Sequence, residues 1–95
     1  AARAITLDGQ PLALTGREYE LLAYLMRRPG RTVRRETLRD DVWGWSVGDA
    51  STVTVHVRRL REKIEAEPSD PRIIATVWGV GYRLDAAALE DGVKP

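Results

Sequence analysis

The sequence predicts one α+β domain, in which a core of three helices lies between an N-terminal antiparallel hairpin and a C-terminal β-hairpin. Two observations place the hairpins: short apolar runs surround Asp8-Gly9 near the start of the chain and Val80-Gly81 near its end. A third places the core, because three segments between them carry apolar residues at helical spacing. We expect this domain to cover residues 1–84, and residues 85–95 to form a C-terminal tail that contains, at most, a short helix.

The composition limits the class of protein. A chain of 95 residues with 43% apolar side chains fits one small domain. It has no cysteine, which excludes disulfides and thiolate metal sites and favours a cytoplasmic location. No run approaches the roughly 20 apolar residues that cross a bilayer, so we expect a soluble chain with no membrane partner. A net charge of only +1 excludes a uniformly basic nucleic-acid binder, so any such surface must be local.

The first hairpin and the first helix are predicted from local signals. Strands are expected at residues 3–7 and 11–14, joined by a tight turn at Asp8-Gly9. A capping box then opens the helix, because the Thr15 hydroxyl and the Glu18 carboxylate each bind an otherwise unpaired backbone amide. The apolar stripe of this helix contains Tyr19, Leu22, Leu25 and Met26, and the helix ends at Pro29-Gly30.

The second helix is expected over residues 34–43. Leu38 and Val42 face the core in this prediction, and Val33 anchors the start of the helix. Arg34 stands where a serine or threonine cap would be preferred, so this helix begins without a good cap.

The third helix, capped by Asp49 or Ser51 and continuing to residue 65, has two faces that need different surroundings. Its apolar stripe contains Val53, Val57, Leu60 and Ile64. Its opposite face carries Ser51, Val55, Arg58 and Arg59, with Thr54 nearer the edge. Arginine can bind guanine through two hydrogen bonds and a valine methyl can contact the thymine methyl, so this face suits the major groove of DNA. From this segment alone, the same residues could instead form the solvent-exposed face of an arginine-rich helix that binds nothing.

The C-terminal hairpin completes the order of elements. Strands are expected at residues 72–77 and 82–84, joined by a turn at Val80-Gly81 that Gly79 and Gly81 flank with positive φ angles. Two helices, the second rich in arginine, followed by a hairpin make a winged helix-turn-helix fold.

Three strings of residues resemble OmpR/PhoB-type response-regulator effector domains. Residues 14–22 (LTGREYELL) resemble the start of the first helix of that family, residues 55–64 (VHVRRLREKI) its recognition helix, and residues 76–84 (TVWGVGYRL) its wing hairpin. The resemblance implies a sequence-specific, double-stranded DNA-binding output domain of a two-component regulator of transcription. The family usually has a four-stranded sheet before its first helix. Only about two strands fit before Thr15, so we expect the first strands to be truncated.

The resemblance also implies partners. They are direct-repeat DNA half-sites bound by a head-to-tail dimer, a receiver domain in the full-length protein, and RNA polymerase. The family contacts the polymerase through the loop between its second and third helices. In this chain that loop contains Trp45, Ser46 and Val47.

Family roles are transferred to matching positions only. Thr54, Val55 and Arg59 face base edges, while Arg58 and Arg61 are among the residues that contact phosphates. Ser51 and Trp78 stand where some relatives have arginine, so the resemblance leaves entry of Trp78 into the minor groove open. The expected DNA-contacting set is Trp43, Ser51, Thr52, Thr54, Val55, His56, Arg58, Arg59, Arg61, Thr76, Trp78, Gly79 and Tyr82.

Other interpretations of these residues are weighed beside this one. His56 has no partners for a metal site or for catalysis, so no enzyme activity, metal or cofactor is expected. Asp40 and Asp41 fit a solvated helix face, and Trp43 fits the core as well as a phosphate contact. The remaining alternative is a winged-helix module that binds a protein partner and no DNA.

Overall fold

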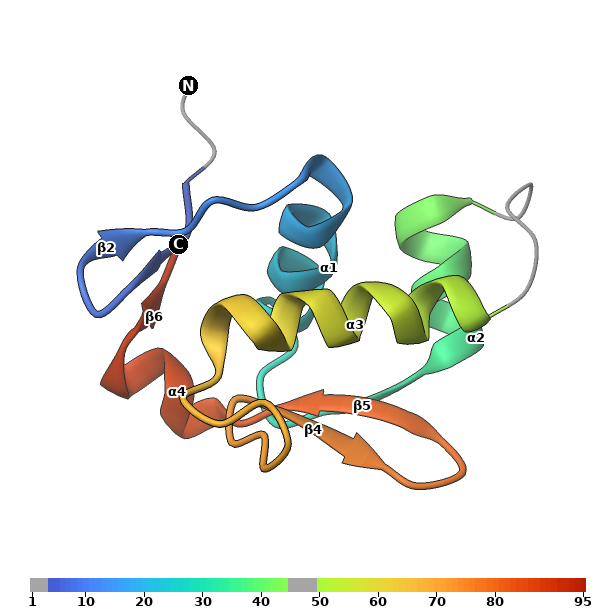
Figure 1. Ribbon diagram of the computed structural model, residues 1–95. Coiled ribbons are helices and arrows are strands. Elements are labelled where there is room, and N and C mark those ends of the chain that lie inside the picture. The colour runs from blue at the N-terminus through green and yellow to red at the C-terminus, as the bar shows by residue number, and fades with distance from the viewer. Residues whose placement is uncertain (1–3, 45–49) are drawn as a thin grey trace.

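The computed structural model describes residues 4–44 and 50–95, and within them the predicted order of hairpin, three helices and hairpin is confirmed (Figure 1). The elements are β1 (Thr6–Leu7), β2 (Gln10–Pro11), α1 (Gly16–Met26), β3 (Thr32–Arg34), α2 (Arg35–Leu38), the π-helical turn η1 (Arg39–Trp43), α3 (Ser51–Ile64), β4 (Ile74–Val77), β5 (Gly81–Leu84), α4 (Ala86–Asp91) and β6 (Val93–Lys94). None of the helices in the described part of the chain has the length and apolar character that crossing a bilayer requires.

The N-terminal sheet has three strands in the order β2-β1-β6. The turn between β1 and β2 lies at Asp8 (φ 52°) and Gly9 (φ 82°), as predicted. The third strand comes from the segment 85–95, which was expected to be a tail and instead forms α4 and β6. Val93 is only 1% exposed and pairs with Leu7 of β1. The few apolar residues of this segment show neither helical nor strand periodicity in the sequence. Only their packing in the folded chain reveals that the segment joins the sheet.

Helix α1 begins at the predicted capping box. The Thr15 hydroxyl accepts a hydrogen bond from the Glu18 amide at 3.2 Å, and the Glu18 carboxylate accepts one from the Thr15 amide at 2.9 Å. Of the predicted stripe, Leu22 and Leu25 are buried while the two outer members are partly buried. Leu21 and Tyr24 are buried as well, so the core-facing side is wider than predicted.

The segment before the second helix differs from the prediction. Thr32–Arg34 forms the strand β3, and Val33 pairs with Tyr82 of β5 instead of anchoring a helix. Arg34 precedes α2 without a side-chain capping bond, as its residue type predicts. A strand of three residues is too short to show an alternating pattern, so it depends on β5 for its definition.

Helix α3 buries the predicted stripe against the core. Val53, Val57, Leu60 and Ile64 are 0–3% exposed. Ala50 precedes the helix without a side-chain capping bond, and Ser51 is its first residue, so the prediction that Ser51 caps it is wrong. The other predicted cap, Asp49, lies outside the described residues.

The C-terminal sheet has the order β3-β5-β4, and β4 and β5 form the wing hairpin beneath α3 (Figure 1). Its turn lies two residues earlier than predicted, because the Val80 amide donates to the Val77 carbonyl at 3.0 Å across Trp78-Gly79. Gly79 has the expected positive φ of 76°, whereas Gly81 lies inside β5 without one. Glycine is required at position 81 because the backbone of β3 lies too close for a side chain. A Cβ there would lie 2.0 Å from the Val33 carbonyl oxygen.

Candidate nucleic-acid interface

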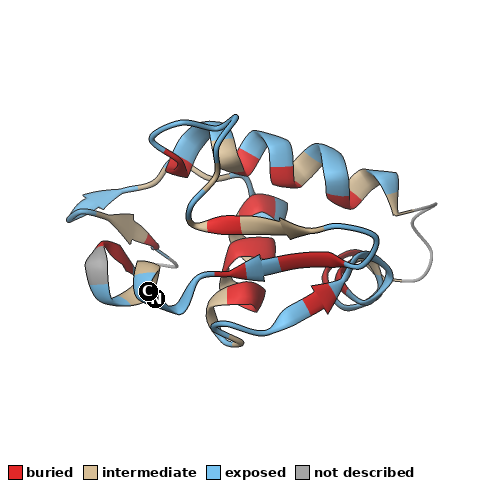
Figure 2. Cartoon of the chain, turned by 90° about the horizontal axis from the view of Figure 1, so that it is seen from below, coloured by how far each residue is buried: buried red, intermediate tan, exposed pale blue. Residues whose placement is uncertain are grey.

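The outer face of α3 is exposed along its length. Figure 2 shows the helix buried on the side toward the protein and exposed on the opposite side. The exposed set includes Ser51, Thr54, Val55, Arg58, Arg59 and Glu62. Val55 is 45% exposed, and neither Arg58 nor Arg59 has an ion pair or hydrogen bond among the described residues. A single helix therefore exposes two guanidinium groups and one apolar side chain on the same face.

The start of α3 is fixed by an aromatic contact with η1. The rings of Trp43 and His56 pack edge to face with their centroids 4.8 Å apart. His56 Nδ1 lies 2.8 Å from the Thr52 carbonyl oxygen. Because a carbonyl only accepts, Nδ1 carries the proton and donates it. Trp43 is 9% exposed and thus belongs to the core, which agrees with the first of the two interpretations of this residue.

The wing presents an aromatic side chain at its turn. Trp78 is 89% exposed, and Gly79 beside it is exposed as well. Tyr82 is buried on the opposite strand and lies beside Arg61 of α3. A hollow of about 500 Å³ lies where α3, the wing and the loop that joins them meet. Its lining consists of Thr54, Arg58, Arg61, Glu62, Pro68, Ser69 and Tyr82.

Arg61, for which the resemblance implies a phosphate contact, is half-buried and binds β4 through its guanidinium group. Its Nε and Nη2 donate to the Ile74 carbonyl oxygen at 3.1 and 2.8 Å, and Nη2 also donates to Thr76 Oγ1 at 2.8 Å. The guanidinium carbon lies 5.6 Å from the centre of the Tyr82 ring. Burial lowers the pKa of Arg61, although the group stays charged. At least two of its donor groups therefore hold β4.

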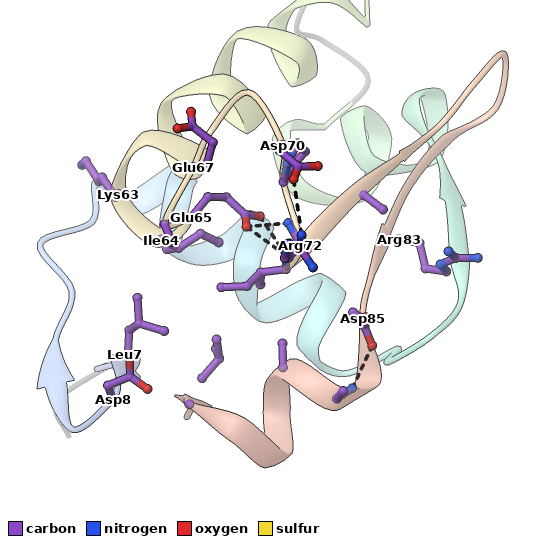
Figure 3. A pocket seen from close by; sticks show the side chains of 18 residues that line it. Leu7, Asp8, Lys63, Ile64, Glu65, Glu67, Asp70, Arg72, Arg83 and Asp85 are labelled. Atoms are coloured by element: carbon purple, nitrogen blue, oxygen red, sulfur yellow. Dashed lines mark hydrogen bonds and ion pairs between the residues drawn. The ribbon is translucent and has the colours of Figure 1, made fainter.

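Glu65 holds the start of the wing, a role that the sequence did not predict. This carboxylate, 8% exposed, accepts hydrogen bonds from the backbone amides of Arg72, Ile73 and Ile74 at 2.7–3.0 Å. Figure 3 shows Glu65 at the end of α3 beside Arg72. The partners of Glu65 are backbone amides seven to nine residues further along the chain, so only the fold of the following loop identifies them.

A second buried carboxylate joins α1 to α3. The Lys63 ammonium lies 2.5 Å from Glu18 Oε1, and it also donates to the Ala13 carbonyl at 2.8 Å. Burial raises the pKa of Glu18, but the hydrogen bonds from Lys63 and Thr15 outweigh burial and hold that pKa below its ordinary value. Helix α3 is thus attached to α1 by charge as well as by apolar packing.

Comparison with known proteins assigns the domain. A profile of the family described as "Transcriptional regulatory protein, C terminal" matches residues 9–84. The chain belongs to this family. Members of the OmpR/PhoB-type family are the DNA-binding output domains of two-component response regulators, with a winged helix-turn-helix fold, and they are not enzymes.

Individual members of this transcriptional regulatory family resemble the chain over most of its length. It is 48% identical over 82 residues to the sensory transduction protein RegX3 of Mycolicibacterium smegmatis, a match that covers 85% of this chain and 36% of RegX3. The response regulator DrrB of Thermotoga maritima has a TM-score of 0.76 and 35% identity over 81% of this chain and 35% of DrrB. The chain therefore spans about a third of the length of these two proteins.

A member of the family has been solved with its target. The DNA-binding domain of Klebsiella pneumoniae RstA, in complex with the RstA box, has a TM-score of 0.72 and 29% identity over 82% of this chain and 78% of that domain.

The remaining expected site residues are placed as follows. Ser51, Thr52, Thr54, Val55, His56, Arg58 and Arg59 share the exposed or half-exposed side of α3, and Thr76, Trp78, Gly79 and Tyr82 lie on the wing. Trp45, Ser46 and Val47, the expected RNA polymerase contact, lie outside the described residues. No group of histidine, cysteine and carboxylate side chains in the described ranges could hold a metal ion.

Proposed function

We propose that this chain binds double-stranded DNA with sequence preference and thereby regulates transcription, with α3 in the major groove and the wing on the neighbouring backbone or minor groove. The observation that carries the proposal is the outer face of α3, where Val55 is 45% exposed beside Arg58 and Arg59, which have no ion pair among the described residues, while the apolar stripe of the inner face is 0–3% exposed. An exposed valine among guanidinium groups suits a base edge better than water.

The roles of the residues follow from their positions. Thr54, Val55 and Arg59 face base edges, where arginine donates two hydrogen bonds to guanine. Phosphate contacts set the register and come from both ends of this surface. They involve Trp43, Ser51, Thr52, His56 and Arg58 near α3, and Thr76, Trp78, Gly79 and Tyr82 on the wing. The hollow that contains Arg58 and Tyr82 supports this division, because a guanidinium group and a phenol suit a phosphate oxygen.

The proposal extends to the longer protein of which such a domain is a part. Because the chain spans 36% of the length of RegX3, we expect a receiver domain to control this output domain in the full-length protein. Two copies would bind direct-repeat half-sites head to tail, and the loop of residues 45–47 would contact RNA polymerase.

Selection from a random DNA pool, followed by binding titration at two salt concentrations, tests the proposal. The selected duplex should bind more tightly than a random duplex, and Arg59→Ala should cost about 1–3 kcal/mol on the selected duplex only. Arg83→Ala is the matched control, since Arg83 is an exposed cation on the strand face opposite to Tyr82.

Two outcomes would refute the proposal. If the protein binds selected and random duplexes equally, sequence preference is wrong. If it binds neither at low salt, the alternative of a winged-helix module for a protein partner replaces it.

A further inference from the structure

The wing is attached to α3 by two side chains that lie one helical turn apart. Ile73 pairs with Asp85 of the neighbouring strand segment, so the amide and carbonyl of the next residue, Ile74, point away from β5. Glu65 accepts from that amide at 2.8 Å, and Arg61 donates to that carbonyl at 2.8 and 3.1 Å. Since β4 is an edge strand, these two groups would otherwise face water or another chain.

Glu65 also fixes how the chain enters the wing. Its two oxygens accept from three consecutive amides, those of Arg72, Ile73 and Ile74. A carboxylate with several amide donors is a strong and directional anchor. The first strand of the wing is therefore held in one direction relative to the end of α3.

Arg61 extends this attachment toward the wing turn. Its Nη2 donates to Thr76 Oγ1 at 2.8 Å, two residues before Trp78. A hydroxyl that accepts from a cation retains its own O–H to donate, so Arg61 also orients the Thr76 proton. The contacts thus run without a break from α3 through Arg61 to the part of the wing that precedes its exposed tryptophan.

We infer that Arg61 and Glu65 are positioning residues that fix the wing relative to α3, so that helix and wing engage the same duplex at once. This role takes the place of the phosphate contact that the resemblance implied for Arg61. A wing held in place before binding costs less ordering entropy on binding than a free one. The inference rests on the proposed DNA-binding function.

Two substitutions separate positioning from simple charge. Arg61→Lys keeps the positive charge, but an ammonium group cannot reproduce the planar fork that binds Ile74 and Thr76. We expect affinity for the selected duplex to fall about tenfold, the scale of one charge-assisted hydrogen bond. Glu65→Gln removes a negative charge, so charge attraction alone would tighten binding, whereas loss of positioning weakens it.

Hydroxyl-radical footprinting provides the decisive measurement, because it reports the α3 and wing contacts separately. Both variants should lose protection at the wing and retain it at α3. Arg72→Ala is the matched control, since its side chain is 85% exposed and only its backbone contacts Glu65. This control should retain the wing footprint although, unlike the two test variants, it loses a cation.

The inference is overturned if Arg61→Lys binds like the natural protein with an intact wing footprint, or if Glu65→Gln binds more tightly. Thermal unfolding checks that each variant is folded, and if Glu65→Gln is not, Arg61→Lys alone decides. If the natural protein footprints no selected duplex, the proposed function fails. Amide hydrogen exchange in the free domain then still tests the attachment of the wing. The Ile74 amide must exchange faster in whichever variant is folded than in the natural protein, and an unchanged exchange rate refutes the attachment.

Discussion

Gly81 is a position where β5 approaches β3 too closely for a side chain, and Gly81→Ala tests the packing of the wing. The added Cβ would lie 2.0 Å from the Val33 carbonyl oxygen and 2.9 Å from Arg34 Cα. Both are backbone atoms that cannot rotate away, so the two strands must separate. Overpacking of this kind costs about 1–3 kcal/mol, and each backbone hydrogen bond lost between the strands adds about 1 kcal/mol. We therefore expect a loss of about 3 kcal/mol or more in the free energy of unfolding.

Urea and thermal unfolding followed by circular dichroism measure this loss. For a domain of this size, about 3 kcal/mol lowers the melting temperature by roughly 12 °C or more. Two glycines serve as controls because neither has an atom within 4 Å of an added Cβ. Gly79→Ala carries only the strain of its positive φ, about 1 kcal/mol, and Gly16→Ala at the start of a helix should be close to neutral. If Gly81→Ala is no more damaging than Gly79→Ala, the close approach of β3 is not what requires glycine.

Three further predictions concern the core, the sheet and the wing. Lys63→Met leaves the Glu18 carboxylate, 3% exposed, without its cation. Because the folded pKa of Glu18 is lowered, its stabilisation is present above the ordinary value of 4.5 and is lost as pH falls through the folded pKa. This loss should be smaller in the variant when urea unfolding is followed from neutral to acid pH, and an identical pH profile would contradict the pairing. Val93→Ala should cost about 2 kcal/mol in unfolding free energy because Val93 is 1% exposed, and a negligible cost would show that β6 does not pack. Trp78→Ala should change stability by less than about 0.5 kcal/mol while weakening binding to the selected duplex, and a large loss of stability would place this side chain in a packed contact.

Local interactions made much of this fold predictable. The capping box joins residues three positions apart, and the stripe of α3 depends on a period of one helical turn. The Asp8-Gly9 turn likewise depends on the φ angles of two neighbouring residues. The two-sided character of α3, which supports the proposed function, was therefore available from residues 51–64 alone.

The site was predictable only in part for the same reason. The outward direction of Val55, Arg58 and Arg59 follows from helical periodicity. The inward direction of Arg61 does not, because its partners lie 13 and 15 residues away on β4. Arg61 lies on the border between the two faces, and the position of a strand in space decides which way its side chain turns.

The sequence by itself determined the order of hairpin, three helices and hairpin, the capping box of α1 and the apolar face of α3, since these depend on a few adjacent residues. The tertiary structure decided the features that depend on distant segments. They are the pairing of β6 with β1, the three-residue strand β3, the need for glycine at position 81 and the attachment of the wing by Arg61 and Glu65. In each case a hydrogen bond or a steric contact joins residues that only folding brings together, and no local pattern records which partner they meet.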